Sequence, residues 1–311
     1  MELRQLKYFQ KVSRLQSVTK AAEELFVAQP SVTASIHKLE AELGLALFDR
    51  SQRNITLTVE GSVFLRRVDE ILSRVDDAVA EMNDYRLRQS GAIRVGIPSM
   101  IGVLLFPKVF TTCTALYPQY ELTVVEEGTI SILRLLEQGK LDIGFVVLFD
   151  QIKDLEVLPV AKGQMMVCLP PGHPLAELPA VPMSSLHDEP FILLKKGTYN
   201  RQMILEQCEK NHFVPNIIFS TSQLETIIGL VEKGVGISFL LDVIARKQHG
   251  IVSRPLEEPL FLETGLVWPK GRYMSNAIKA FISFVTASFS AKTLDDVEGD
   301  PVNEGREESA S

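Results

Sequence analysis

The sequence has little cysteine, and no two of its cysteines lie close together. Cys113, Cys168 and Cys208 are widely separated and form no CxxC motif. Closely spaced cysteines are the usual sign of a disulfide framework or a zinc site, so we expect three reduced, structural thiols. The N-terminus has no long apolar run, and we expect that the chain has no apolar stretch of 18 residues. We therefore expect no signal peptide, no membrane span and a cytoplasmic protein.

The motifs of the common enzyme classes are missing as well. There is no HExxH, no Walker A loop, no GxGxxG and no GxSxG. Asp142, Glu126 and Glu127 lie near predicted strand ends without an evident catalytic partner. We therefore expect no catalysis, no metal and no cofactor. The histidines are isolated from one another: His37, His173, His187, His212 and His249.

The length and the charge distribution indicate several domains. A chain of 311 residues is long enough for two or three domains. Its net charge of −7 argues against a uniformly basic nucleic-acid binder, but the acidic excess is uneven. Residues 1–58 carry eight basic and six acidic residues and are the only net-positive block, whereas residues 292–311 carry two and seven. We expect that acidic tail to be disordered.

Three helices and a hairpin are predicted within residues 1–58. Apolar residues at helical spacing indicate helices over about 3–15, 18–25 and 30–43, and Gly44 is suited to end the third helix. Two short extended pieces follow around the polar turn 51–54. This order is typical of a winged helix-turn-helix. The apolar stripe of the third helix consists of Val32, Ile36, Leu39 and Leu43.

Residues 59–89 are predicted to form a single long linker helix. The segment from Thr58 to Gln89 has no proline, and its apolar residues alternate at spacings of four and three. Such a heptad stripe favours pairing with a second copy of the same helix, although packing against the chain's own C-terminal part remains the alternative. The stripe consists of Phe64, Val68, Ile71, Val75, Ala78, Met82 and Tyr85.

Residues 90–291 alternate between predicted strands and helices, which indicates a parallel α/β sheet. The pattern restarts midway, so we expect two lobes. The first comprises 90–161 and 267–291 and the second 162–266, with the chain crossing near Val160–Lys162 and returning near Gly265–Trp268. The predicted fold is therefore multidomain α/β, with a winged helix-turn-helix, a linker helix and a two-lobed domain.

The front end of the third helix is suited to insertion into a DNA groove. Pro30 fits the first helical position, and the free N–H groups there can bind phosphate. Glutamine can bind base edges, and small hydroxyl side chains permit a close approach. Arg50 and Arg53, on the hairpin, are placed to contact the DNA backbone or a minor groove. The predicted DNA-binding residues are Gln29, Pro30, Ser31, Thr33, Ser35, Lys38, Arg50 and Arg53.

These residues belong to a longer pattern. The stretch LRQLKYFQKV, followed by SVTKAAEELFVAQPSVTASIHKLEAELGLALFDR and ITLTVEG, resembles the LysR-type transcriptional regulators. The phrases GKLDIG (139–144), HPLA (173–176) and LVEKGVGISFL (230–240) look like phrases of that family's effector domain. The resemblance covers the whole chain. It implies a winged helix, a dimer made by the linker helix, a two-lobed effector domain like the periplasmic binding proteins, and tetramers controlled by a small molecule.

Four positions depart from the pattern of that family, one of them Leu241, which replaces a frequent proline without an evident functional meaning. Ala28 replaces the usual serine, which leaves helix capping to Gln29 or water. Ala34 and His37 replace residues that are often basic. Phosphate contacts, and with them the salt dependence of DNA binding, should therefore be weaker than in a more basic relative.

Four helices are predicted to begin at hydroxyl-bearing turns after strand ends, where α/β lobes bind ligands. Backbone N–H groups and hydroxyls at helix starts suit an anion, so we expect a small organic anion. Each serine or threonine by itself has the alternative role of a simple helix cap. Arg201 can add a charge or lie in solvent. The resemblance places effector contacts at Ser99, Met100, Thr129, Val147, Thr198 and Tyr199.

We therefore expect a regulator that binds double-stranded promoter DNA as a homodimer or homotetramer and acts on RNA polymerase, without a membrane partner. Two other classes stay open. A transporter's solute-binding protein shares the two-lobed shape but lacks residues 1–89. An oligomerisation scaffold would use the helix pair to bind protein.

Overall fold

The computed structural model describes residues 1–49, 55–87, 91–150, 152, 154–289 and 292–293. The chain forms two compact units, Met1–Arg86 and Leu87–Ser311. Arg50, Arg53 and the predicted turn 51–54 lie outside the described residues.

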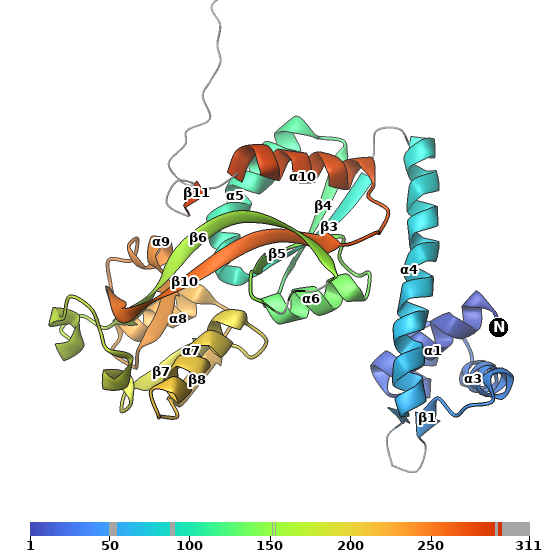
Figure 1. Ribbon diagram of the computed structural model, residues 1–311, viewed down its shortest axis with the longest axis horizontal. Helices are drawn as coiled ribbons and strands as arrows, with labels where there is room; N and C mark the ends of the chain where they lie inside the picture. The colour runs from blue at the N-terminus through green and yellow to red at the C-terminus, as the bar shows by residue number, and fades with distance from the viewer. Residues whose placement is uncertain (50–54, 88–90, 151, 153, 290–291, 294–311) are drawn as a thin grey trace, which may run out of the picture. The chain divides into compact units, whose positions relative to one another are not determined.

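The N-terminal unit contains the helices and the hairpin that the sequence predicts (Figure 1). Its elements are α1 (Leu3–Leu15), α2 (Val18–Glu24), α3 (Gln29–Leu43), the antiparallel strands β1 (Phe48–Asp49) and β2 (Thr56–Leu57), and α4 (Val59–Leu87), which ends at the first residue of the second unit.

One apolar cluster holds the N-terminal unit together. Phe9 of α1 is fully buried, and its ring contacts those of Phe48 and Phe64 at centroid distances of 5.3 and 5.2 Å. The predicted inward stripe of α3 joins this cluster through Val32, Ile36 and Leu39. The helix ends at Gly44, whose φ of 68° favours glycine as predicted.

Helix α4 is capped at its start by Thr58, whose hydroxyl oxygen accepts a hydrogen bond from the backbone N–H of Gly61 at 2.9 Å. Phe64 and Val68, the first two members of the heptad stripe, pack into the N-terminal core together with Leu72. The surface left for pairing with a second helix is therefore shorter than the predicted stripe, because Phe64 and Val68 are already buried in the N-terminal core.

The second unit is built on a long mixed sheet with a smaller sheet beside it. Its strands and helices are β3 (Gly91–Ile97), α5 (Ser99–Leu116), β4 (Tyr120–Glu126), α6 (Thr129–Glu137), β5 (Ile143–Val147), β6 (Leu155–Leu169), the short 3-10 helices η1 (Pro174–Glu177) and η2 (Met183–Leu186), β7 (Pro190–Leu194), α7 (Tyr199–Lys210), β8 (Asn216–Thr221), α8 (Leu224–Glu232), β9 (Ser238–Leu241), α9 (Asp242–Ala245), β10 (Val252–Pro269), α10 (Asn276–Phe289) and β11 (Lys292–Thr293).

The expectation of a parallel sheet is only partly correct. Strand β3 pairs in parallel with β4 and β5, and β7 pairs in parallel with β8. However, β10 runs antiparallel to both β5 and β6, and β6 runs antiparallel to β9. The sheet is mixed because two strands cross the unit in opposite directions.

These two strands, β6 and β10, run side by side through the whole unit (Figure 1). They are longer than the sequence indicates. Pro159 and Pro255 lie within them, and a proline in a sequence argues against a strand. The ladder accommodates this with irregularities between Pro255 and Leu260 and between Thr264 and Gly265. The lobe boundary predicted for the crossing segments stays a prediction.

Helices cover both faces of the first-lobe sheet, β3, β4 and β5. Helices α5 and α10 pack into the main core with Val95 and Phe145, whereas α6 packs on the opposite face against Val146 and Val267. The second lobe contains β7, β8 and β9 with α7 and α8.

Helix α5 corrects one expectation from the sequence. By length and composition alone it is apolar enough to cross a membrane, so the expectation that no apolar stretch of 18 residues exists is wrong. Core helices pass the same test, and Met100, Ile101, Leu105 and Val109 of α5 are buried in the main core.

The start of the predicted tail also differs from expectation. Residues 292–293 form β11 and pair in parallel with Ala161 and Lys162 of β6. Residues 294–311 lie outside the described part.

The two lobes touch where α6 and α7 begin. We call this contact the lobe seam: residues 98–100, 126–131 and 147–149 of the first lobe against residues 195–201. The two backbones approach closely at Gly128, where an added Cβ would lie 2.2 Å from the carbonyl oxygen of Gly197. Only glycine permits so close an approach of two backbones.

Replacing Gly128 should therefore destabilise the second unit. In Gly128→Ala the new methyl must push the lobes apart, which should cost about 1–3 kcal/mol and lower the melting temperature by about 2–10 °C. The matched control is Gly229→Ala in α8, where an added Cβ meets no atom within 4 Å. It should keep the wild-type temperature or exceed it. Calorimetry of both variants gives the comparison, and equal melting of Gly128→Ala and wild type would mean that the seam is not closed in solution.

Candidate functional site

The face of α3 opposite its buried stripe is exposed, and it carries most of the predicted DNA-binding residues. Gln29, Pro30, Ser31 and Lys38 are exposed, and Ser35 is half-buried. The burial of Val32, Ile36 and Leu39 orients the helix, so this face is available to a partner.

The start of α3 has no side-chain cap. Ala28 is the N-cap residue and makes no side-chain cap bond. Gln29 does not replace it, because its amide donates instead to the hydroxyl of Thr33 at 3.1 Å. Thr33 is half-buried and also lines a small apolar hollow with Val12, so it is less available than the other predicted residues. Uncapped N–H groups at a helix start are suited to a phosphate.

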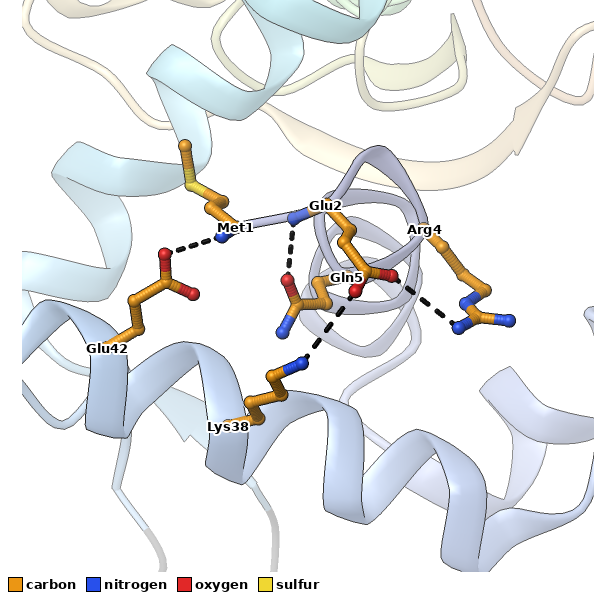
Figure 2. Close-up of polar contacts among 6 residues, drawn as sticks. All are labelled: Met1, Glu2, Arg4, Gln5, Lys38 and Glu42. Atoms are coloured by element: carbon orange, nitrogen blue, oxygen red, sulfur yellow. Dashed lines mark hydrogen bonds and ion pairs between the residues drawn. The ribbon is translucent and has the colours of Figure 1, made fainter.

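Figure 2 shows a polar cluster beside this face that the sequence did not reveal. Arg4 and Lys38 lie on either side of the Glu2 carboxylate, and the N-terminal ammonium pairs with Glu42. These groups border a groove between α1 and α3. It is lined by Glu2, Arg4, Gln5, Tyr8, Val27, Ser31, Ala34, Ser35 and Lys38.

The contribution of α1 to this groove was missed. Arg4 and Tyr8 lie one helical turn apart and therefore share a face of α1. That spacing is visible in the sequence, but only the packing of α1 against α3 shows that the face adjoins Ser31 and Lys38. Arg50 and Arg53, the predicted wing contacts, lie outside the described residues.

The linker helix presents an apolar surface from its middle onward. Met82 and Tyr85 are 58% and 73% exposed, and Ile71 is partly exposed. An open apolar hollow runs along this face and is lined by Ile71, Arg74, Val75, Ala78, Val79 and Met82. Exposed apolar side chains in such a row indicate a protein contact.

Three of the predicted effector residues, Met100, Thr198 and Tyr199, lie where the lobes touch. The other three, Ser99, Thr129 and Val147, form hydrogen bonds within the first lobe. Met100 of α5 is buried, and its sulfur accepts a hydrogen bond from the amide of Asn200 of α7 at 3.3 Å. Tyr199 stacks on Phe149 with ring centroids 4.7 Å apart. These contacts join the two lobes at the residues that the sequence selected.

The hydroxyl groups of the seam do not cap their own helices. Ser99 donates to the Glu126 carboxylate at 2.7 Å, and Thr198 donates to the carbonyl oxygen of Lys195 at 3.0 Å. Thr129 accepts from the backbone N–H of Val147 at 3.1 Å. Helices α5, α6 and α7 thus begin without side-chain caps. The alternative of simple capping is therefore not what the structure shows.

One further hydroxyl near the seam was missed by the sequence reasoning. Thr264 of β10 is the strand partner of Val147 and is 1% exposed, and within the described part of the chain its hydroxyl has no hydrogen-bond partner. An unsatisfied buried hydroxyl costs free energy, so Thr264 is a candidate contact for a ligand or water. Nothing in the stretch LETGLV marks this threonine as buried.

Several charges lie close to the seam. Lys195 pairs with Glu127 at 3.5 Å. Arg201 is engaged by the Leu194 carbonyl and the Ser220 hydroxyl, so it is not simply solvated. Burial, followed by the charges of Glu206 and Asp150, raises the pKa of Tyr199. This hydroxyl therefore stays protonated at neutral pH and can donate a hydrogen bond.

The three cysteines are free and buried, as expected. Burial raises the pKa of Cys168 and of Cys208 to about 12 and also raises that of Cys113. They therefore lack thiolate character at neutral pH. Within the described residues, no group of three or more histidine, cysteine, aspartate or glutamate side chains is placed to hold a metal ion.

Comparisons with known proteins agree with this arrangement. The family model for the LysR substrate binding domain matches residues 87–290, and that for the bacterial regulatory helix-turn-helix protein of the lysR family matches residues 3–62. The chain is 31% identical to the uncharacterized HTH-type transcriptional regulator YcgK of Bacillus subtilis (strain 168), over 95% of this chain and 97% of that protein.

Two solved structures resemble the chain over nearly their full length. A full-length OxyR variant from Pseudomonas aeruginosa matches with a TM-score of 0.64 and 26% identity, covering 92% of this chain and 95% of the other. Full-length CbnR in complex with its target DNA matches with a TM-score of 0.58, covering 92% and 99%, and at 19% identity it supports the fold alone.

Both units and the order of their elements thus agree with one family along the length of the chain, and the expectation of a regulator rather than an enzyme is confirmed. The chain belongs to the LysR family and is a LysR-type DNA-binding transcriptional regulator with an effector-binding domain.

Proposed function

We propose that α3 reads promoter DNA by placing Gln29, Pro30 and Ser31 in the major groove. The observation that carries this proposal is the exposure of these residues at an uncapped helix start whose opposite face is buried. The match of residues 3–62 to the family model of the bacterial regulatory helix-turn-helix protein supports the same use of the unit. Ser35 and Lys38 lie farther along the exposed side and contact the backbone, as do Arg50 and Arg53 from the wing.

Removing the base-reading side chains should abolish sequence preference. The double variant Gln29→Ala/Ser31→Ala should bind the intergenic fragment upstream of its own gene at least about tenfold more weakly, because each base contact contributes about 1–3 kcal/mol. Binding to a random duplex of equal length should be unchanged. The readout is fluorescence anisotropy at fixed salt.

Ser13→Ala serves as the control, because this hydroxyl donates to the Phe9 carbonyl within α1 and should have no effect on either affinity. Retention of wild-type preference by the double variant would contradict the role of α3. Nonspecific binding by the wild type that the double variant leaves unchanged would instead favour a scaffold that uses the helix pair to bind protein.

We also propose that α4 joins two copies through its exposed apolar face, residues 71–85. The hollow along Val75, Ala78 and Met82 matches the later positions of the heptad stripe, where a second helix would pack. Such a dimer presents two α3 helices to one duplex. Homotetramers and an effect on RNA polymerase, in the cytoplasm, are part of the same proposal.

A charge in this face should separate the copies. Met82→Glu should convert the protein to a monomer while leaving its fold intact, because Met82 is 58% exposed in the single chain. Ala80→Glu, which adds the same charge to α4 outside the hollow, should remain dimeric. Sedimentation velocity distinguishes the two species, and a dimeric Met82→Glu variant would overturn the assignment of this face.

We propose, finally, that the lobe seam binds a small organic anion and that binding changes the spacing of the paired DNA-binding units. Support comes from three uncapped helix starts at one seam, the hydroxyls of Ser99, Thr129 and Thr198, and the protonated Tyr199. Met100 and Val147 line the same contact. An effector acts only if it binds the lobe arrangements unequally.

Isothermal titration with a panel of small carboxylates, amines and sugars tests this assignment. A carboxylate should bind to the wild type, and Thr129→Val should weaken that binding about ten- to hundredfold, since a hydrogen bond to a charged group contributes about 1.5–3 kcal/mol. Thr111→Val removes an α5 hydroxyl that bonds Pro107 instead and should bind normally. Exclusive binding of amines or sugars would exclude the anion.

A further inference from the structure

A carboxylate occupies the cationic end of the groove between α1 and α3. One oxygen of Glu2, Oε1, lies 3.7 Å from the Lys38 ammonium, and the other, Oε2, lies 3.5 Å from the Arg4 guanidinium (Figure 2). A DNA phosphate also presents anionic oxygens to arginine and lysine. Glu2 therefore stands where such a phosphate would bind these two cations.

The position of Glu2 is set by neighbouring contacts on both sides. Its backbone N–H donates to the Gln5 side-chain oxygen at 2.6 Å, and the preceding residue is tied to α3 because the Met1 ammonium pairs with Glu42. These contacts hold the start of α1 beside α3. The carboxylate is thus kept close to Lys38 even though all three charged side chains are largely exposed.

The same groove contains an unmet donor. Gln5 is 3% exposed, and its amide nitrogen Nε2 has no hydrogen-bond partner among the residues that the structure describes. Buried polar groups normally have partners. Gln5 lines the groove together with Ser31, Ser35 and Lys38, which the proposed function assigns to DNA. An anion entering the groove would find two cations and an amide donor, with Glu2 as the group already present.

We propose that Glu2 is an internal competitor for the DNA phosphates. Its carboxylate reduces the charge of the Arg4, Lys38 and Glu2 group from +2 to +1, and a phosphate must displace it to contact both cations. Glu2 thereby lowers the affinity for every duplex by a similar factor. The base contacts of α3, which carry no charge, then provide a larger share of the free energy of binding. This inference rests on the proposed function of α3.

Replacing this carboxylate isolates its effect. Glu2→Gln keeps the backbone contact to Gln5 and removes only the charge. For each DNA-binding unit, it should tighten binding to a random duplex about two- to fivefold, which is the range expected for an exposed ion pair. The plot of log affinity against log salt concentration should steepen by up to about 0.9 per unit, the value for one additional phosphate contact. The affinity for the promoter fragment should rise by the same factor.

Two controls separate competition from a general change of charge. Glu24→Gln removes an exposed carboxylate of the same unit that pairs with Lys11, outside the groove, and should change affinity and salt slope less than Glu2→Gln. In the background Arg4→Gln/Lys38→Gln, adding Glu2→Gln should have no further effect. Circular dichroism and melting curves confirm that each variant is folded.

The outcomes are distinguishable from failure of the proposed function. Equal effects of Glu2→Gln and Glu24→Gln, or an undiminished effect in the background lacking both cations, would overturn the competition while leaving sequence-specific binding by the wild type intact. A wild type that binds DNA without sequence preference would overturn the proposed function alone. Binding of the wild type and Glu2→Gln to the random duplex would still measure the competition between Glu2 and phosphate. A wild type that binds no duplex would overturn both.

Discussion

The burial of one face of α3 is the constraint on which the DNA-binding unit depends. Val32, Ile36 and Leu39 are held against Phe9 and its aromatic neighbours, and this packing leaves the helix a single orientation. The exposed side is then determined, so Gln29, Pro30 and Ser31 become available as a group. Small polar side chains contribute little to a core, but at the start of a fixed helix they permit close contact with another molecule.

The second unit uses a different constraint, the close approach of two backbones. Strands β6 and β10 connect the lobes, and Gly128 allows α6 to begin directly against Gly197. The hydroxyls at this seam are held by hydrogen bonds within their own lobes, and the close approach at Gly128 brings the start of α6 to the start of α7. A ligand that bound there would alter the same contacts, which gives a physical route from a small molecule to the lobe arrangement.

Much of this organisation could be predicted from the sequence, because helical periodicity reports local packing. The bounds of α1 and the orientation of α3 follow from the spacing of their apolar residues. The length of β6 and β10 could not, because each strand contains proline, which in a sequence argues against a strand. Their pairing with each other joins residues that lie far apart in the chain. The effector residues came from a family resemblance, and the structure adds that Met100, Thr198 and Tyr199 lie where the two lobes touch.

What the sequence could not provide are contacts between elements that lie far apart in the chain. Glu2 and Lys38 are 36 positions apart, and nothing local indicates that they approach each other. The same holds for Thr264, whose burial depends on its place beside β5. The apolar stripe of α4 could be predicted from the sequence. The burial of Phe64 and Val68 in the N-terminal core could not, because it depends on contacts with α1 and the hairpin.

In the proposed dimer, two copies of this chain present paired α3 helices to successive turns of one duplex. Selection of binding sites from a library of random duplexes tests it and requires no identified promoter. A dimer with paired α3 helices should enrich an inverted repeat whose half-site centres lie a whole number of helical turns apart, in multiples of about 10–10.5 base pairs. Enrichment of a single undivided site, or of no sequence at all, would contradict it.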